Sequence, residues 1–267
     1  MQAVRKALGS YADRVRIEIH ESAESTNTLA KSTSEEDTPT LIIARTQTGG
    51  RGRLGRSFHS PANTGLYMTA AYTTEKPLAE AVRVTCAAAV AAVSAIEALT
   101  GKHPAIKWVN DIYLNGGKMG GILTEAVTRP DGRHRLIVGI GLNLTTTDFP
   151  EGLRAPAASL FSREEAASLP PDLRDTLAGE ITRRLLELVE GSPACPFPDG
   201  MWGDACLDFY RSRLLYVGER VICTRGTEEL EGVAVGVDGN YSLLLDQNSR
   251  TVALSSGELS LRPLGKI

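Results

Sequence analysis

The segment of this sequence best suited to binding or catalysis contains three arginines spaced among four glycines. The segment Gly-Gly-Arg-Gly-Arg-Leu-Gly-Arg occupies residues 49–56 and directly follows the apolar run 41–44. Glycine lets backbone N–H groups approach a ligand closely, and arginine supplies a charged fork that matches the oxygens of carboxylates and phosphates. The pattern predicts a loop that wraps a small anion. A flexible, solvated turn with scattered charge is the alternative.

Two common nucleotide-binding loops are excluded. The glycines satisfy the formal pattern G-x-G-x-x-G, and Glu75 lies downstream as the dinucleotide fingerprint asks. That fingerprint also requires a helix to begin at the loop. Here Pro61 follows, and residues 66–72 have the pattern of another strand. A Walker-type phosphate loop is excluded because no Gly-Lys-Ser/Thr follows the glycines.

The composition indicates a globular protein with a substantial hydrophobic core. A chain of 267 residues, 42% of them hydrophobic, holds one large domain or a main domain with a small satellite. The net charge of −3 argues against general capture of nucleic acid. The four scattered cysteines favour neither a zinc site nor disulfides. The N-terminus lacks the apolar core of a signal peptide, and the apolar stretch 84–96 is too short to span a bilayer. We therefore expect a soluble, cytoplasmic protein without membrane or nucleic-acid partners.

Hydrophobic periodicity predicts a main domain of mixed helices and strands, followed by a small β-rich domain. Strands are expected at 15–19, 41–44, 66–72, 105–108, 111–114, 118–127 and 135–144, and helices after a cap at residues 25–27 and at 78–99, 172–189 and 203–214. From about Tyr216 onward, short alternating runs separated by turns predict a small β-barrel. We place the domains at 1–215 and 216–267, although no low-complexity linker marks the boundary.

The segment Lys-Trp-Val-Asn-Asp, residues 107–111, gathers a cation, an amide and a carboxylate at the end of a short strand. Period-two alternation puts Lys107, Val109 and Asp111 on one face. The alternative is a core tryptophan followed by a simple turn.

Lys118 stands at the mouth of a strand that contains Gly120 and Gly121. Paired glycines in a strand admit a close ligand or a bulge, so Lys118 either holds a carboxylate or is a solvated lysine at a hairpin tip. Asn143 ends another strand in apolar surroundings. A buried amide without a partner costs roughly 1–3 kcal/mol, so its partner is either neighbouring backbone or a bound ligand.

Together these segments resemble the catalytic domain of the biotin protein ligases, also called biotin–acetyl-CoA-carboxylase ligases. The resemblance rests on Ser25-Thr26-Asn27, Gln47, 50–56, 107–111, 118–125 and 139–143, which occur in the family's order and spacing. The β-rich end matches the position of the family's SH3-like barrel. The resemblance implies an α+β fold: a mixed-sheet domain of the biotin/lipoate ligase, class II synthetase-like type with that barrel appended.

The implied activity has two steps. Biotin is activated with ATP to biotinyl-5′-AMP, with Mg²⁺ accompanying the ATP, and is then transferred to a lysine of a biotin carboxyl carrier protein. In the catalytic roles that the resemblance implies, Lys118 contacts the carboxyl and acyl-phosphate oxygens. Arg51 and Arg53 hold the phosphates and close over the intermediate, while Asp111 orients Lys118 or assists the incoming amine.

The resemblance also implies two sets of binding residues. The biotin site comprises Ser25, Thr26, Asn27, Gln47, Arg51, Gly52, Arg53, Lys118, Gly120 and Gly121. The ATP site comprises Arg53, Arg56, Phe58, Lys107, Asn110 and Asn143. No fixed protein site for a metal ion is expected.

The sequence departs from the family pattern at two positions. Val109 stands where most members carry proline, and Phe58 stands where a tryptophan typically lies near the adenine. The residues before the first strand are too few for the winged helix-turn-helix of biotin-responsive repressors, so we expect a monofunctional ligase without DNA binding. A homodimer through an edge strand near 135–144 is plausible by resemblance. Two readings compete with the ligase: a lipoate or octanoate ligase or transferase of the same superfamily, and a non-catalytic biotin-binding sensor.

Overall fold

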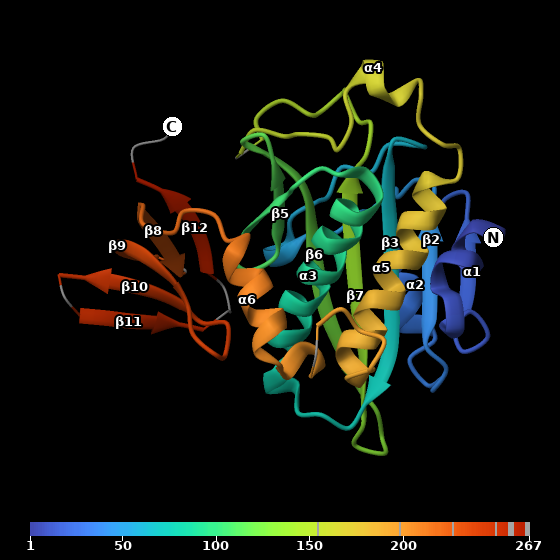
Figure 1. The fold of residues 1–267 in the computed structure, drawn as a ribbon, viewed down its shortest axis with the longest axis horizontal. Helices are drawn as coiled ribbons and strands as arrows, with labels where there is room; N and C mark the ends of the chain where they lie inside the picture. Colours follow the sequence, from blue (N-terminus) through green and yellow to red (C-terminus); the bar gives the residue numbers. More distant parts are fainter. Residues whose placement is uncertain (154, 198, 226, 249, 256–258, 265–267) are drawn as a thin grey trace.

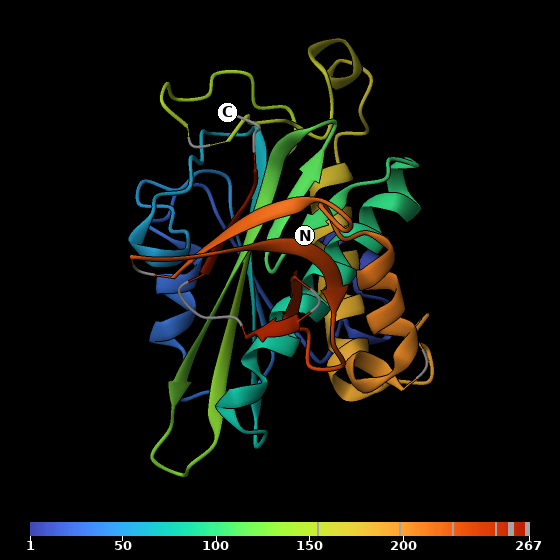
Figure 2. The same ribbon diagram turned by 90° about the vertical axis from the view of Figure 1, so that its left-hand side faces the viewer.

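The computed structural model describes residues 1–153, 155–197, 199–225, 227–248, 250–255 and 259–264. Within these residues the chain forms a seven-stranded sheet with helices on both faces, and a separate five-stranded sheet (Figures 1 and 2). The predicted α+β class is therefore confirmed. The last residues of the expected C-terminal domain, 265–267, lie outside the described residues.

Seven strands form the main sheet in the order β1-β2-β3-β7-β6-β5-β4. Their bounds are β1 (Arg16–His20), β2 (Thr40–Ala44), β3 (Gly65–Thr74), β4 (Ala105–Lys107), β5 (Asp111–Leu114), β6 (Gly117–Thr128) and β7 (His134–Asn143). β1 and β2 run parallel, and every other neighbouring pair is antiparallel. β7 is paired with β3 and β6 on its two sides. The strand near 135–144 is therefore not the edge strand that the sequence analysis expected, because it is paired along both sides.

The helices divide between the two faces of the sheet. Their bounds are α1 (Gln2–Leu8), α2 (Thr26–Ser32), α3 (Ala81–Thr100), α4 (Arg163–Ala166), α5 (Leu173–Glu190) and α6 (Asp204–Ser212), with short 3₁₀ turns η1 (Gly9–Tyr11), η2 (Arg53–Gly55), η3 (Leu78–Glu80) and η4 (Gly200–Trp202). α3 and α5 cover one face, whereas α2 lies on the other (Figures 1 and 2). The sequence did not predict α4, which begins with a capping box between Ser162 and Glu165.

Helix α3 is the central element of the larger core. Its alanine-rich sequence lets it pack closely, and the alanines at 87–89 are completely buried. The segment Val82–Thr100 is long and apolar enough to cross a membrane by length and composition, which corrects the shorter stretch read from the sequence. Within the structure, 67% of the most apolar part of this segment is buried, so its apolar side chains cover the main sheet.

Helix α2 has much less apolar support. The only buried apolar cluster described on its face comprises Ala30, Ile42, Ala71 and Ile137. Ser25 is the N-cap residue, but its side chain makes no capping hydrogen bond, contrary to the predicted cap. Polar contacts with the sheet must therefore supply much of what holds α2 in place.

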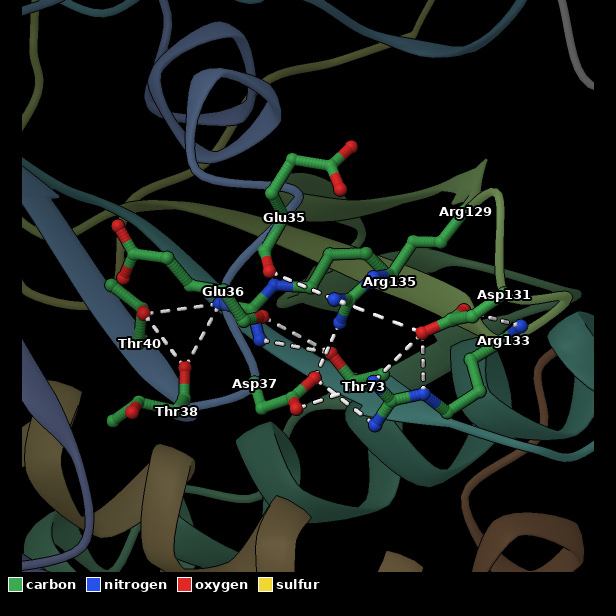
Figure 3. A network of polar contacts seen from close by, with 10 residues as sticks. All are labelled: Glu35, Glu36, Asp37, Thr38, Thr40, Thr73, Arg129, Asp131, Arg133 and Arg135. Carbon is green, nitrogen blue, oxygen red and sulfur yellow. Dashed lines mark hydrogen bonds and ion pairs between the residues drawn. The ribbon is translucent and has the colours of Figure 1, made fainter.

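One such polar network lies at the tip of the β6–β7 hairpin (Figure 3). Arg129 and Arg133 both converge on Asp37, which belongs to the loop between α2 and β2. Beneath them, the fully buried Arg135 donates to the carbonyl of Thr38 and the hydroxyl of Thr40, each at 3.0 Å. The hairpin and the loop that follows α2 are thereby fastened to each other.

The second sheet follows the order β11-β10-β9-β8-β12. Its strands are β8 (Arg220–Arg225), β9 (Glu228–Val237), β10 (Leu243–Gln247), β11 (Arg250–Leu254) and β12 (Leu259–Pro263). The sequence predicted the first four strands but not β12. Trp108 Nε1 donates to the carbonyl of Tyr241 at 2.9 Å, and the rings of Tyr210 and Tyr241 meet edge to face at 5.2 Å. These contacts join the second sheet to the main domain.

We predict that Asp37→Asn lowers the free energy of unfolding at neutral pH but not in acid. Hydrogen bonds from Arg129 and Arg133 hold the pKa of Asp37 below its ordinary value of 3.8. A lowered folded-state pKa gives stability that is complete above the unfolded value and is lost as the pH falls through the folded value. Urea unfolding of both proteins at pH 7 and at a pH below the lowered, folded-state pKa of Asp37 measures this. An equal difference between the two proteins at both pH values would contradict it.

Candidate active site

Two adjoining cavities open where the glycine–arginine loop meets the ends of β5, β6 and β7. The first has a volume of about 150 Å³, and its walls come from α2, the loop 51–58, the turn 107–111 and strands β6 and β7. The second, about 650 Å³, falls in the usual range for small-molecule sites. The two cavities share Arg56, Ser57, Phe58, Lys107, Asp111, Lys118 and Leu261. A ligand that occupies both must therefore pass Lys118.

Polar groups whose orientations are fixed line one end of the first cavity. The backbone N–H of Thr26 donates to Gln47 Oε1 at 2.9 Å, and Gln47 Nε2 donates to Ser60 Oγ at 3.0 Å. Ser60 in turn donates to the carbonyl of Phe58. The amide of Gln47 is thus held in one orientation, which suits a ligand with its own fixed donors and acceptors.

Glycines in β7 allow two other elements to approach the sheet closely. A Cβ at Gly139 would lie 2.2 Å from Asn27 Oδ1, and a Cβ at Gly141 would lie 2.6 Å from the ring of Phe58. Both glycines line the first cavity, although the sequence did not place them in the site. The signal was present: a Gly-x-Gly pattern puts both residues on one face of a strand.

The paired glycines of β6 behave differently from each other. Gly121 lines the first cavity, and a Cβ there would sit 3.6 Å from Lys118 Cε. A Cβ at Gly120 would instead meet the Gly141 carbonyl and the Leu142 side chain, both at 2.6 Å. Gly120 lines neither described cavity, so the prediction that it makes room for the ligand does not match the geometry.

The chain reverses direction within residues 108–110, and this brings Lys107 and Asp111 side by side as partners on β4 and β5. The predicted period-two alternation through Val109 is therefore wrong, and the alternative turn is correct. Lys118 Nζ lies 2.6 Å from Asp111 Oδ1. Burial lowers the pKa of Lys107, the charge of Asp111 raises it, and Lys118 and Arg56 lower it further. Three cations and one carboxylate thus meet at the junction of the cavities, which favours an anion there.

The arginines of the loop differ in how firmly they are held. Arg53 Nη1 donates to Asn110 Oδ1 at 3.0 Å, and Asn110 Nδ2 donates to the carbonyl of Ile122 at 2.9 Å. Burial lowers the pKa of Arg53, with the charge of Asp111 acting in the opposite direction. Arg51 and Arg56 are exposed, and the guanidinium of Arg51 lies 3.8 Å from Glu125. Arg53 is part of the wall, whereas Arg51 and Arg56 face solvent.

The structure brings together the predicted site residues with few exceptions. The first cavity holds Ser25, Thr26, Asn27, Gln47, Arg51, Gly52, Arg53, Arg56, Phe58, Lys107, Asn110, Asp111, Lys118 and Gly121. Asn143 lines only the second cavity, and its Nδ2 donates to the carbonyl of Ala158 at 3.2 Å. The partner of this buried amide is thus neighbouring backbone.

Two groups of lining residues had no local signal in the sequence. The segment after β7 contributes Phe149, Gly152, Leu153, Ala155 and Ala157 to the second cavity, and the second sheet contributes Thr224, Leu261 and Arg262. Neither group carries a motif, because its members come together only when the two sheets are in place.

Comparison with known proteins assigns the chain to a family. A family described as "Biotin/lipoate A/B protein ligase family" matches residues 19–143, and "Biotin protein ligase C terminal domain" matches residues 216–262. The chain is 39% identical to the "Bifunctional ligase/repressor BirA" of Bacillus subtilis, over 91% of its own length and 73% of that protein. It is 30% identical to the "Biotin--[acetyl-CoA-carboxylase] ligase" of Mycobacterium tuberculosis, over 86% and 82% of the two lengths. The chain belongs to the biotin protein ligase family.

Solved structures of biotin protein ligases agree with this assignment. The ligase of Aquifex aeolicus in complex with biotin and ATP matches with a TM-score of 0.73 and 25% identity, over 93% of this chain and 99% of that one. Among the sequence relatives, the "Bifunctional ligase/repressor BirA" of Bacillus spizizenii is 43% identical, over 45% of this chain and 38% of that protein. The predicted family and its fold are confirmed.

We predict that Gly139→Ala destabilises this biotin protein ligase by about 1–3 kcal/mol, the usual cost of overpacking. The added methyl group would meet Asn27 Oδ1, which hydrogen bonds already hold against the sheet. Gly239→Ala is the matched control, because a Cβ there meets nothing within 4 Å. Urea unfolding measures both variants. Equal stability of the two would show that α2 moves away without cost.

Proposed function

We propose that this chain activates biotin with ATP to form biotinyl-5′-AMP and then transfers the biotin to a lysine of a biotin carboxyl carrier protein. The observation that carries the proposal is the meeting of two cavities at the Lys118–Asp111 ion pair. One cavity has a fixed polar end suited to a ureido ring, and the other is large enough for a nucleotide. The ligase of Aquifex aeolicus, solved with biotin and ATP, supports the assignment of the two ligands.

The first step joins two anions. A carboxylate oxygen of biotin attacks the α-phosphorus of ATP, the bond to the bridging oxygen breaks, and pyrophosphate leaves. Preorganised cations stabilise the charge that gathers at the α-phosphate. Lys118 stands at the junction that the reacting atoms would occupy. The Mg²⁺ that accompanies the ATP substrate would screen the charge of the leaving pyrophosphate.

The remaining cations take roles according to how they are held. Arg53, fixed by Asn110, contacts the phosphates from the wall of the site, and Lys107 approaches them from β4. The exposed Arg51 and Arg56 turn inward when the ligand binds, so that the loop excludes water from the mixed anhydride. Catalysis then comes from positioning and charge stabilisation, without a covalent enzyme intermediate.

The other predicted residues divide between the two ligands. We assign the biotin ring to Ser25, Thr26, Asn27, Gln47, Gly52 and Gly121. We assign the nucleotide to Phe58, Asn110 and Asn143. Phe58 offers an aromatic face beside the second cavity, with its ring edge to face with Tyr67 at 6.4 Å.

In the second step, the amine of the carrier lysine attacks the acyl carbon, AMP leaves and the amine loses a proton. Asp111 accepts a hydrogen bond from Lys118 and faces the junction, so it either orients Lys118 or assists the incoming amine. We propose a cytoplasmic location, because free thiols stay reduced there and the four cysteines are buried and form no disulfides. We also propose the domain division 1–215 and 216–267.

Pyrophosphate release from the purified protein tests the proposal directly. ATP is supplied with biotin, lipoate or octanoate, and the adenylate is identified by mass spectrometry before an apo carrier domain is added. Turnover with biotin supports the ligase. Preference for lipoate or octanoate would move the protein to the sister enzymes of the superfamily, and biotin binding without pyrophosphate would indicate a sensor.

We predict that Lys118→Ala lowers the rate of biotin-dependent pyrophosphate release by about 100-fold or more, because it removes the cation nearest the reacting atoms. Lys6→Ala, on the exposed surface of α1, serves as the charge-matched control and keeps the full rate. A near-normal rate for Lys118→Ala would remove Lys118 from the mechanism.

We predict that Arg51→Ala forms the adenylate but releases it into solution, because the loop loses a contact with the intermediate. Filtration of the reaction mixture separates free adenylate from the protein-bound form. The free fraction should exceed that of the unchanged protein several-fold. Tight retention by the variant would argue against the lid.

A further inference from the structure

Strand β6 departs from regular pairing around Lys118. Its pairing with β7 ends at Gly120 and Leu142. On its other side, Ile112 pairs with Gly120 but the next residue of β5 pairs with Lys118, so that Met119 is an extra residue in β6. A bulge of this kind re-aims the side chains beside it and disrupts the ladder of backbone hydrogen bonds. The backbone of Lys118 must therefore find partners outside β7.

A short segment after β7, residues 156–158, supplies these partners, and we call it the strap. The N–H of Lys118 donates to the carbonyl of Pro156 at 2.7 Å, and the N–H of Ala158 donates to the carbonyl of Lys118 at 2.9 Å. The two bonds form a parallel bridge between Lys118 and Ala157. The strap thus takes the place beside β6 that β7 leaves, and it holds both polar groups of the Lys118 backbone.

The strap is itself fixed to the end of β7. Asn143 Nδ2 donates to the carbonyl of Ala158 at 3.2 Å, and the N–H of Leu160 donates to the carbonyl of Asn143 at 2.8 Å. The next residue, Phe161, donates from its N–H to the carbonyl of Leu144 at 2.8 Å. Leu160 and Phe161 are both buried. The main sheet therefore determines where the strap lies, and the strap passes that position on to Lys118.

Gly117 allows the strap to lie this close to β6. The glycine is buried, and a Cβ there would lie 2.7 Å from the Cβ of Ala158 and 3.0 Å from the carbonyl carbon and oxygen of Ala157. Carbon atoms in contact are normally about 3.5–4.0 Å apart. A side chain at this position would therefore push the strap away from Lys118.

We propose that the strap is a positioning element for Lys118 and that Gly117 is the positioning residue on which it depends. Lys118 Nζ lies 2.6 Å from Asp111 Oδ1 at the junction of the two cavities. This ion pair holds only the end of a flexible four-carbon side chain, whereas the strap holds the backbone from which the side chain extends. The inference rests on the proposed function, because it concerns how Lys118 is aimed at the α-phosphate.

Gly117→Ala tests the role of the strap. The measured quantity is the rate of the first turnover of pyrophosphate release at saturating biotin and ATP. We expect this rate to fall about tenfold, because even a small misplacement of a catalytic group is costly. The biotin concentration that gives half of the rate should stay within about twofold, since the biotin end of the site is formed by α2 and Gln47.

Two further variants separate this effect from overpacking as such. Gly179→Ala is the matched control, because a Cβ there would lie 2.7 Å from the Cβ of Ala7 and 2.6 Å from the carbonyl oxygen of Val4, where α5 packs on α1. It should lower the free energy of unfolding and keep the full rate. Ala158→Gly removes the nearest contact of the new methyl group, so the double variant Gly117→Ala/Ala158→Gly should recover most of the rate.

Hydrogen exchange provides a second measurement that needs no substrate. The amide proton of Lys118 is bonded to the carbonyl of Pro156, so it should exchange faster in Gly117→Ala but not in Gly179→Ala. If Gly117→Ala does not fold, Ala158→Pro replaces it, because proline lacks the N–H that donates to the carbonyl of Lys118. The same fall in the first-turnover rate is then expected.

Several results would overturn the inference. These are an unchanged first-turnover rate or unchanged exchange at Lys118 in Gly117→Ala, a weaker response to ATP with the full rate at saturation, an equal loss of rate in Gly179→Ala, and a rate that stays low in the double variant. Absence of biotin-dependent release by the unchanged protein would instead refute the proposed function. Faster exchange at Lys118 in Gly117→Ala would still support the strap in that case, so the two failures are distinguishable.

Discussion

The site depends on a short helix that is held to the sheet mainly by hydrogen bonds. α2 covers a small apolar cluster, and its first turn is fixed through Thr26, Asn27 and their partners in β3 and β6. Gly139 allows this approach, because a side chain there would occupy the place of the Asn27 amide. Hydrogen bonds are directional, whereas apolar contacts are not. The polar end of the cavity therefore has fixed donors and acceptors as well as a fixed shape.

Charge is arranged differently at the other end of the site. Lys107 and Lys118 flank the single carboxylate of Asp111 where the two cavities meet, and Arg53 is already docked on Asn110. Burying this many cations costs free energy when no anion is present, as the lowered pKa values of Lys107 and Arg53 indicate. A polyphosphate ligand offsets that cost. The protein thus meets its substrate with cations that are positioned before binding and with loop arginines that remain exposed.

The second sheet contributes to the same site. Leu261 lines both cavities, and Thr224 and Arg262 line the larger one. The hydrogen bond from Trp108 to Tyr241 connects this sheet to the turn that bears Asn110 and Asp111. A change in the position of the second sheet would therefore shift Asn110 and Asp111 in the wall of the first cavity.

The sequence alone predicted most of the helices and strands, without α4 and β12, and most of the residues that line the first cavity. It could do so because hydrophobic periodicity and the glycine–arginine, Lys-Trp-Val-Asn-Asp and Lys-Met-Gly-Gly segments are local patterns. Contacts between distant segments were decided only by the tertiary structure. The central place of β7, the turn that pairs Lys107 with Asp111, and the packing of Gly120 against Gly141 and Leu142 depend on which strands become neighbours. Thr69 is the clearest case. Its hydrogen bonds with Asn27 and Thr26 exist only after α2 has docked on the sheet.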